Sequence, residues 1–109
     1  MRITYANNRI ERLCKDENQM EKEFDHNKEL IDGLKALMIL LEQLDNIFYI
    51  MKFLPCYKLE KVTGSKNNAY SIRIIPKKRK SPYRMYLIPY NDGIEINIQK
   101  IDAHEYKNL

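Results

Sequence analysis

The sequence predicts a single α+β domain, in which an N-terminal strand and a helical hairpin pack on one face of a small antiparallel β-meander. Two patterns predict this class. Apolar residues recur at intervals of three and four through residues 27–44, which is typical of a helix with one buried face. In the last third of the chain, short apolar runs alternate with polar residues and are separated by turn residues, which is typical of antiparallel strands. A chain of 109 residues has room for one core.

The first half of the chain is predicted to hold a strand and the helices. A short strand covers residues 2–6 and a polar helix covers residues 9–24. The strongest helix covers residues 27–44, where Gly33 is expected to allow close packing against the preceding helix. Residues 45–55 are predicted to form a short helical turn that closes one end of the core, because they are too apolar for an exposed loop.

The second half is predicted to form the meander. Its strands are expected at residues 70–75, 83–90 and 94–101, with a further candidate at residues 56–62. Asn91-Asp92-Gly93 is a hairpin signal, since these residue types tolerate the positive φ of tight turns. With helices on one face, the other face of the sheet is available to bind a partner.

The charge is unevenly distributed. Residues 58–84 contain nine Lys or Arg and one acid, whereas the remaining residues contain ten bases and fourteen acids. This asymmetry favours a local anionic partner. A solvated loop explains the basic run at residues 77–80 well, but it explains Arg73 and Arg84 less well, because both lie inside apolar strands.

The remaining composition excludes several classes. Cys14 and Cys56 have no CxxC spacing, and nothing in the spacing favours a metal site with His26 and His104, so two reduced thiols in a cytoplasmic protein are expected. The N-terminal residues contain no apolar signal segment. The most apolar window, residues 36–54, is interrupted by charges, so no membrane partner is expected. No cofactor is expected either.

Four stretches in order resemble the RelE/HigB-type bacterial toxins, which are small ribosome-dependent mRNA endonucleases. The stretches are Tyr57-Lys-Leu-Glu-Lys-Val-Thr-Gly64, Tyr70-Ser-Ile-Arg73, Tyr83-Arg84 and Ile98-Gln-Lys-Ile-Asp-Ala-His104. The resemblance covers nearly the whole chain, including the order of elements, and implies a RelE-like fold. The chain differs at Glu60, where many members have a histidine, and at Ala103, which replaces a tyrosine.

The resemblance implies a type II toxin that cleaves mRNA in the ribosomal A site without a metal. It also implies inhibition by a cognate antitoxin, typically a helix-turn-helix, HigA-like protein, through which the toxin meets operator DNA only indirectly. The partners expected for this chain are therefore an antitoxin, the ribosome and mRNA.

Metal-free RNA cleavage uses the ribose 2′-OH as nucleophile, so it needs a base, an acid and cations around the phosphate. Arg73 and Arg84 match the family's basic positions, and a planar guanidinium holds two phosphate oxygens at once. His104 matches the last residue of the family's closing stretch and titrates near neutral pH. Asp102 is expected to orient His104, and Glu60 is a candidate general base.

The remaining candidates are predicted to contact RNA. For Lys58 and Lys61 this role and simple solvation are equally favoured, and Tyr106 is a candidate substitute for the missing tyrosine. The basic loop adds Lys77, Lys78, Arg79 and Lys80.

Three hypotheses about function stay open. Retention of the two arginines, Asp102 and His104 favours the nuclease, whereas the changes at Glu60 and Ala103 favour a weak or inactive toxin-fold protein that binds an antitoxin and modulates operon repression. A gyrase-poisoning branch of the same superfamily is the more distant alternative.

Overall fold

The structure is a computed structural model, and it describes residues 1–76 and 81–103. Within these residues the strands form one sheet in the order β1-β5-β4-β3-β2. The strands are β1 (Arg2–Tyr5), β2 (Glu60–Lys61), β3 (Tyr70–Arg73), β4 (Tyr83–Tyr90) and β5 (Glu95–Ala103). The helices are α1 (Asn8–Lys15), α2 (Glu17–Glu23), α3 (Lys28–Gln43) and α4 (Tyr49–Phe53), and the 3₁₀ turns are η1 (Pro55–Tyr57) and η2 (Asn91–Gly93). The predicted α+β class is confirmed.

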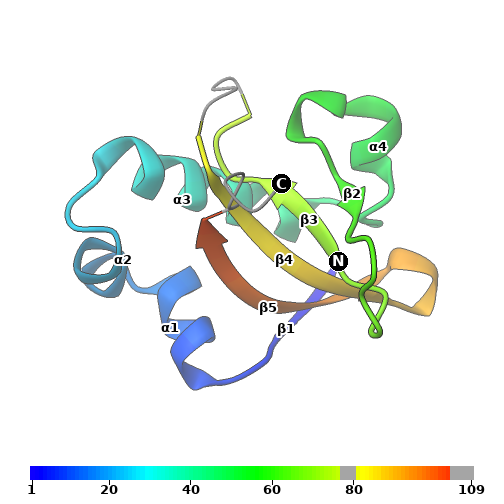
Figure 1. Cartoon of the computed structure of the whole chain (residues 1–109), viewed down its shortest axis with the longest axis horizontal. Helices are drawn as coiled ribbons and strands as arrows, with labels where there is room; N and C mark the ends of the chain where they lie inside the picture. Colours follow the sequence, from blue (N-terminus) through cyan, green and yellow to red (C-terminus); the bar gives the residue numbers. More distant parts are fainter. Residues whose placement is uncertain (77–80, 104–109) are drawn as a thin grey trace.

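The sheet is an antiparallel meander with one parallel edge strand. Strands β2 to β5 pair antiparallel in chain order, as expected for a meander. Strand β1 pairs parallel with β5, with Ile3 opposite Ile96 and Tyr5 opposite Ile98. The sheet is therefore mixed, because the chain passes through the helices before it returns to lie beside its first strand (Figure 1).

Helix α3 covers one face of the sheet and supplies most of the helical part of the core. Figure 1 shows α3 crossing behind β3 and β4. Leu34, Leu37 and Leu41 on α3 are completely buried. Against them lie the buried strand residues Ile72, Met85, Leu87, Ile96 and Ile98, together with Ile74, which directly follows β3. The opposite face of the sheet carries no helix in Figure 1.

The predicted continuous helix over residues 9–24 is wrong, because the chain breaks at Asp16. This residue has an extended backbone, with φ −108° and ψ 112°, and its carboxylate accepts a hydrogen bond from the Asn18 amide. Asp16 thus ends α1 and caps α2. The break turns α2 so that Met20 and Phe24 join the core that Leu13 of α1 already contacts.

Gly33 lies against the end of β3 and not against the preceding helix, so that expectation is wrong. A Cβ at Gly33 would meet the Ile74 carbonyl oxygen at 3.0 Å and Ile75 Cγ1 at 3.1 Å. The absence of a side chain therefore lets α3 approach the sheet.

The segment before the meander is less regular than predicted. The expected strand at residues 56–62 shrinks to β2, because Pro55–Tyr57 forms η1 and Lys58 adopts a left-handed conformation with φ 51°. The predicted helical turn is confirmed as α4. The predicted tight turn at residues 91–93 is also confirmed, as η2, with positive φ at all three residues.

Candidate functional site

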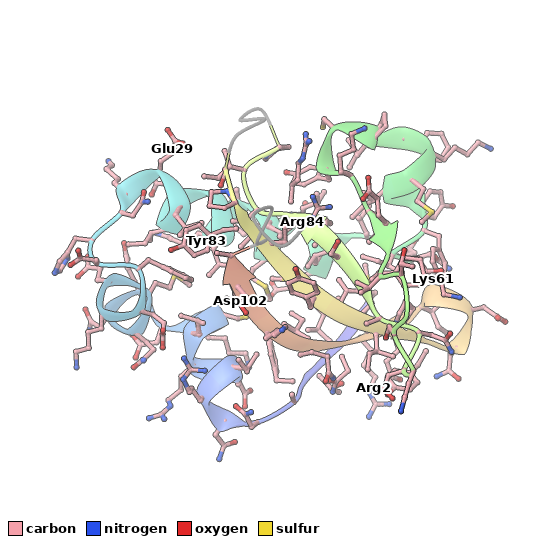
Figure 2. The ribbon with its side chains drawn as sticks, viewed as in Figure 1. Arg2, Glu29, Lys61, Tyr83, Arg84 and Asp102 are labelled. Atoms are coloured by element: carbon pink, nitrogen blue, oxygen red, sulfur yellow. The ribbon has the colours of Figure 1, made fainter. Side chains whose placement is uncertain are left out.

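The register of the meander places three of the predicted site residues in one row. Arg73 of β3 pairs with Arg84 of β4, and Arg84 pairs with Asp102 of β5. Directly paired residues on antiparallel strands point to the same face of the sheet. Figure 2 shows Arg84 and Asp102 on the same part of the sheet, with Lys61 at the β2 edge.

This row lies on the face opposite α3. The neighbouring row consists of Ile72, Met85 and Ile101, and Ile72 and Met85 are completely buried in the core. Because side chains alternate between faces along a strand, the row of Arg73, Arg84 and Asp102 points away from the core. We call this helix-free side of the sheet, with its two rows of polar residues, the open face.

The second polar row of the open face lies two residues away along each strand. Ser71 pairs with Tyr86, and Tyr86 pairs with Lys100, while Glu60 of β2 continues the row beyond Ser71. The Lys100 Nζ lies 5.0 Å from the centre of the Tyr86 ring, within range of a cation–π interaction. Beyond this row the pairing of β4 with β5 shifts between Tyr86 and Leu87.

Arg84 is the most buried charged residue of the site. Its residue is 8% exposed, its Nε donates to the Ser71 hydroxyl at 3.1 Å, and its Nη2 donates to the Lys58 carbonyl at 2.7 Å. Within residues 1–76 and 81–103, no ion pair involves Arg84. A buried guanidinium without an ion-pair partner among these residues favours an anion as a further partner.

Arg73 has the opposite character. Its side chain is half-buried at the end of β3, and within the described part of the chain it makes no hydrogen bond or ion pair. Among the described residues, the Arg73 guanidinium thus has no polar partner, whereas that of Arg84 is partly engaged by the protein. Their cross-strand pairing keeps two positive charges together on one face.

Asp102 does not neutralise this pair. Its carboxylate lies 3.7 Å from Lys100 Nζ and accepts a hydrogen bond from the Ala103 amide at 2.8 Å. The row therefore has a cationic end at β3 and β4 and an acidic end at β5.

The predicted residues of the β2 region are all exposed. Glu60 shares the open face with Ser71, whereas Lys61 pairs with Tyr70, which belongs to the helix side of the sheet. Lys58 contributes its backbone carbonyl to Arg84, and its side chain is exposed. His104, Tyr106, Lys77, Lys78, Arg79 and Lys80 lie outside the described residues.

Sequence reasoning missed Ser71 and Lys100 as members of the site. Both lie two positions from a predicted site residue on the same strand, Arg73 and Asp102 respectively, so period-two alternation was the signal that could have found them.

Metal-binding clusters and membrane-spanning helices are both absent from the part of the chain that the structure describes. There, no three His, Cys, Asp or Glu side chains come together as ligands of a metal ion. Within the same part, no helix has the length and apolarity needed to cross a lipid bilayer.

Compared with known protein families, with curated proteins and with solved structures, the chain matches none of them.

Proposed function

We propose that this protein is the toxin of a type II toxin–antitoxin system and acts as a metal-independent, ribosome-dependent mRNA endonuclease. The observation that carries the proposal is the cross-strand pairing of Arg73 with Arg84 on the open face. This pairing supports the roles that the resemblance to RelE/HigB-type toxins assigns to both arginines.

The arrangement suits the chemistry of ribose-assisted cleavage. When the 2′-OH attacks the adjacent phosphate, negative charge builds up on the phosphorane oxygens. The guanidinium of Arg73 binds those oxygens, and Arg84 adds a second fixed positive charge in a poorly solvated position. His104 is proposed as the titrating group and Asp102 as the residue that orients it, with Glu60 as an alternative base.

The proposed setting is the cytoplasm, where the toxin meets the ribosome and mRNA. A helix-turn-helix antitoxin is proposed as the partner that restrains it. The exposed Lys58 and Lys61 are proposed to contact the RNA backbone outside the cleavage row.

A growth experiment tests the proposal. Induction of the wild-type chain without antitoxin is expected to stop growth, and primer extension on a translated mRNA is expected to show cuts within codons. Arg73→Ala is expected to remove most of the effect, since removal of one donor that stabilises transition-state charge typically costs about 100-fold or more in rate. Arg2→Ala is the matched control, because Arg2 is a 77% exposed arginine side chain on the distant β1 edge of the sheet.

A wild-type chain that is harmless on induction would contradict the nuclease proposal. Growth arrest with intact mRNA and damaged DNA would instead indicate gyrase poisoning. A second candidate is the inactive toxin-fold protein that binds an antitoxin. The hydrogen bonds that commit Arg84 to Ser71 and Lys58 favour this candidate, because they occupy donors that phosphate would use.

A further inference from the structure

Helix α4 exposes an aromatic surface that the open face does not account for. Tyr49 is 48% exposed and Phe53 is 59% exposed, and their rings stack with centroids 5.5 Å apart and planes 30° apart. Lys52 lies between them in sequence, with its Nζ 5.4 Å from the centre of the Phe53 ring. Large exposed apolar side chains that gather in one place mark an interaction site.

Helix α4, which carries the aromatic pair, is packed firmly against the rest of the protein. Ile50 on the inner side of α4 is completely buried, and the Phe48 ring packs edge-on against Tyr70 of β3 at 5.5 Å. The Ile47 amide donates to the Gly93 carbonyl at 2.8 Å, which fixes the start of α4 to η2. Because the scaffold is already ordered, a ligand that stacks on these rings loses little binding energy to ordering the protein.

An open hollow adjoins the pair. Its volume is about 560 Å³, and it is lined by Asn46, Phe48, Tyr49, Lys52, Phe53 and Asp92. Three of these residues are aromatic and one is a cation. The carboxylate of Asp92 is an acceptor of the kind that base amino groups use.

The hollow itself is lined by one cation, Lys52, and one acid, Asp92, and the excess of positive charge lies in the chain that follows α4. Residues 46–76 contain five Lys or Arg and one acid, whereas residues 1–45, which form β1 and the first three helices, contain seven bases and ten acids. An acidic or phosphate-bearing partner is therefore favoured at the α4 end of the molecule over the α1–α3 end.

The same region is connected to the arginine row. The chain runs from α4 through η1 to Lys58, whose carbonyl accepts the hydrogen bond from Arg84. Figure 1 shows α4 beside the β2 and β3 end of the sheet, which is also the cationic end of the row. Because Ile50 and Phe48 pack α4 on the helix side of the sheet, a nucleic acid strand that extends from Arg73 to α4 would have to cross Lys58 and η1 on the way.

We infer that Tyr49, Lys52 and Phe53 form a base-stacking subsite for single-stranded RNA, separated from the proposed cleavage row by Lys58 and η1. The inference rests on the proposed function and names the place where the substrate strand leaves the row. Aromatic faces stack on any base, and the lysine adds phosphate attraction, so the subsite contributes affinity without sequence preference. A purely apolar peptide would use the rings but has no need for the positive charge.

The test is direct binding, measured by fluorescence anisotropy with a labelled 2′-O-methyl oligoribonucleotide of about 12 nucleotides, which falls within known single-strand site sizes. The 2′-O-methyl groups prevent cleavage, so the measurement is independent of nuclease activity. Tyr49→Ala and Phe53→Ala are each expected to raise Kd about fivefold or more, the range known for loss of one stacked base. Tyr49→Phe keeps a ring and is expected to bind like the wild type.

Two further variants sharpen the result. Phe53→Leu keeps apolar area but removes the ring, and it is expected to bind as weakly as Phe53→Ala. Ile39→Ala is the matched control, since Ile39 is 57% exposed on α3, and it is expected to leave Kd unchanged. The free energy of unfolding of each variant, measured in urea, is expected to stay close to the wild-type value, which shows that α4 still packs on the core.

Unchanged Kd in both alanine variants, or no binding by the wild type at low salt, would overturn the inference. Full binding by Phe53→Leu would overturn it too, because it would show that the Phe53 ring does not stack on a base. If the wild type cleaves mRNA on ribosomes while the alanine variants bind unchanged, the inference alone fails. Absence of cleavage by the wild type is the separate failure of the proposed function.

Discussion

Arg84 donates a hydrogen bond from its Nη2 to the backbone carbonyl of Lys58, 2.7 Å away and 26 residues earlier in the chain. The carbonyl belongs to the residue at which η1 ends in a left-handed conformation. Arg84 also donates a hydrogen bond from its Nε to the Ser71 hydroxyl at 3.1 Å. Together the two hydrogen bonds connect the segment before β2 to β3 and β4 in the middle of the sheet. One residue thus has a part in stability as well as in the proposed chemistry.

Replacement of Arg84 by alanine is therefore expected to lower the free energy of unfolding more than replacement of Arg73. Arg84→Ala leaves the Ser71 hydroxyl and the Lys58 carbonyl without their donor, and an unsatisfied buried group costs about 1–3 kcal/mol. We expect the free energy of unfolding to fall by about 2–4 kcal/mol, measured by urea denaturation. Arg73→Ala is expected to change it by less than about 0.5 kcal/mol, since Arg73 makes no polar contact within the described residues. Equal losses in the two variants would contradict this assignment.

Much of the fold could be predicted because its signals are local. The three-and-four spacing of residues 27–44 produced α3, and the alternation of residues 94–101 produced most of β5. The neighbouring placement of Arg73 and Arg84 also followed from sequence, because consecutive hairpin strands are neighbours in a meander.

The errors come from interactions between distant segments. The parallel pairing of β1 with β5 joins residues more than 90 positions apart, so neither strand's own pattern contains it. A glycine inside a helix is typical of close contact with another helix, but Gly33 lies against Ile74 and Ile75, which directly follow β3. The burial of Arg84 depends on the path of the chain at Lys58, which no periodicity specifies.

Gly93 is predicted to be far less replaceable than Gly64, although both have positive φ, +95° and +80°. A Cβ at Gly93 would lie 2.5 Å from Asn46 Oδ1 and 2.6 Å from Phe48 Cδ2, whereas a Cβ at Gly64 meets nothing within 4 Å. Gly64→Ala therefore costs only the backbone strain, about 1–2 kcal/mol. Gly93→Ala adds displacement of Asn46 and Phe48, so its loss in urea denaturation is expected to exceed that of Gly64→Ala by about 1–3 kcal/mol. Similar losses of stability in the two variants would show that Asn46 and Phe48 move aside at little cost.

The two cysteines are predicted to differ in reactivity. Cys14 is buried, and burial raises the pKa of its thiol to about 12, so the thiol stays protonated at neutral pH. Cys56 is exposed. A thiol reagent at pH 8 is expected to modify Cys56 within minutes and Cys14 only after unfolding, because the thiolate is the reactive form. Mass spectrometry of Cys56→Ser under native and denaturing conditions checks this, and rapid native labelling of that variant would contradict it.

The same pKa shift predicts a loss of stability at high pH. The thiol of Cys14 has a raised pKa in the folded state, so the unfolded state binds fewer protons than the folded state above pH 9. The free energy of unfolding is then expected to fall as the pH rises from 9 towards 12. Tyr5, whose pKa is raised to about 12 mainly by burial, acts in the same direction above pH 10. In Cys14→Ala the free energy of unfolding, measured by urea denaturation at a series of pH values, is expected to fall less steeply with rising pH. The same dependence on pH as in the wild type would exclude Cys14 as the cause of the loss of stability.

Asp16 is predicted to stabilise the break between α1 and α2, although it interrupts what looks like one helix. Its carboxylate caps α2 through the Asn18 amide at 2.9 Å. Alanine is a better helix former than aspartate, but we expect α1 and α2 to stay separate in Asp16→Ala. Met20 and Phe24 are only 2% and 7% exposed, and one continuous helix would move both side chains out of the core. We therefore expect unchanged helix content by circular dichroism and a loss of about 1 kcal/mol in the free energy of unfolding. Asp16→Asn keeps a capping oxygen and is expected to lose much less. A stabilised Asp16→Ala variant with increased helix content would instead show that the two helices prefer to be one.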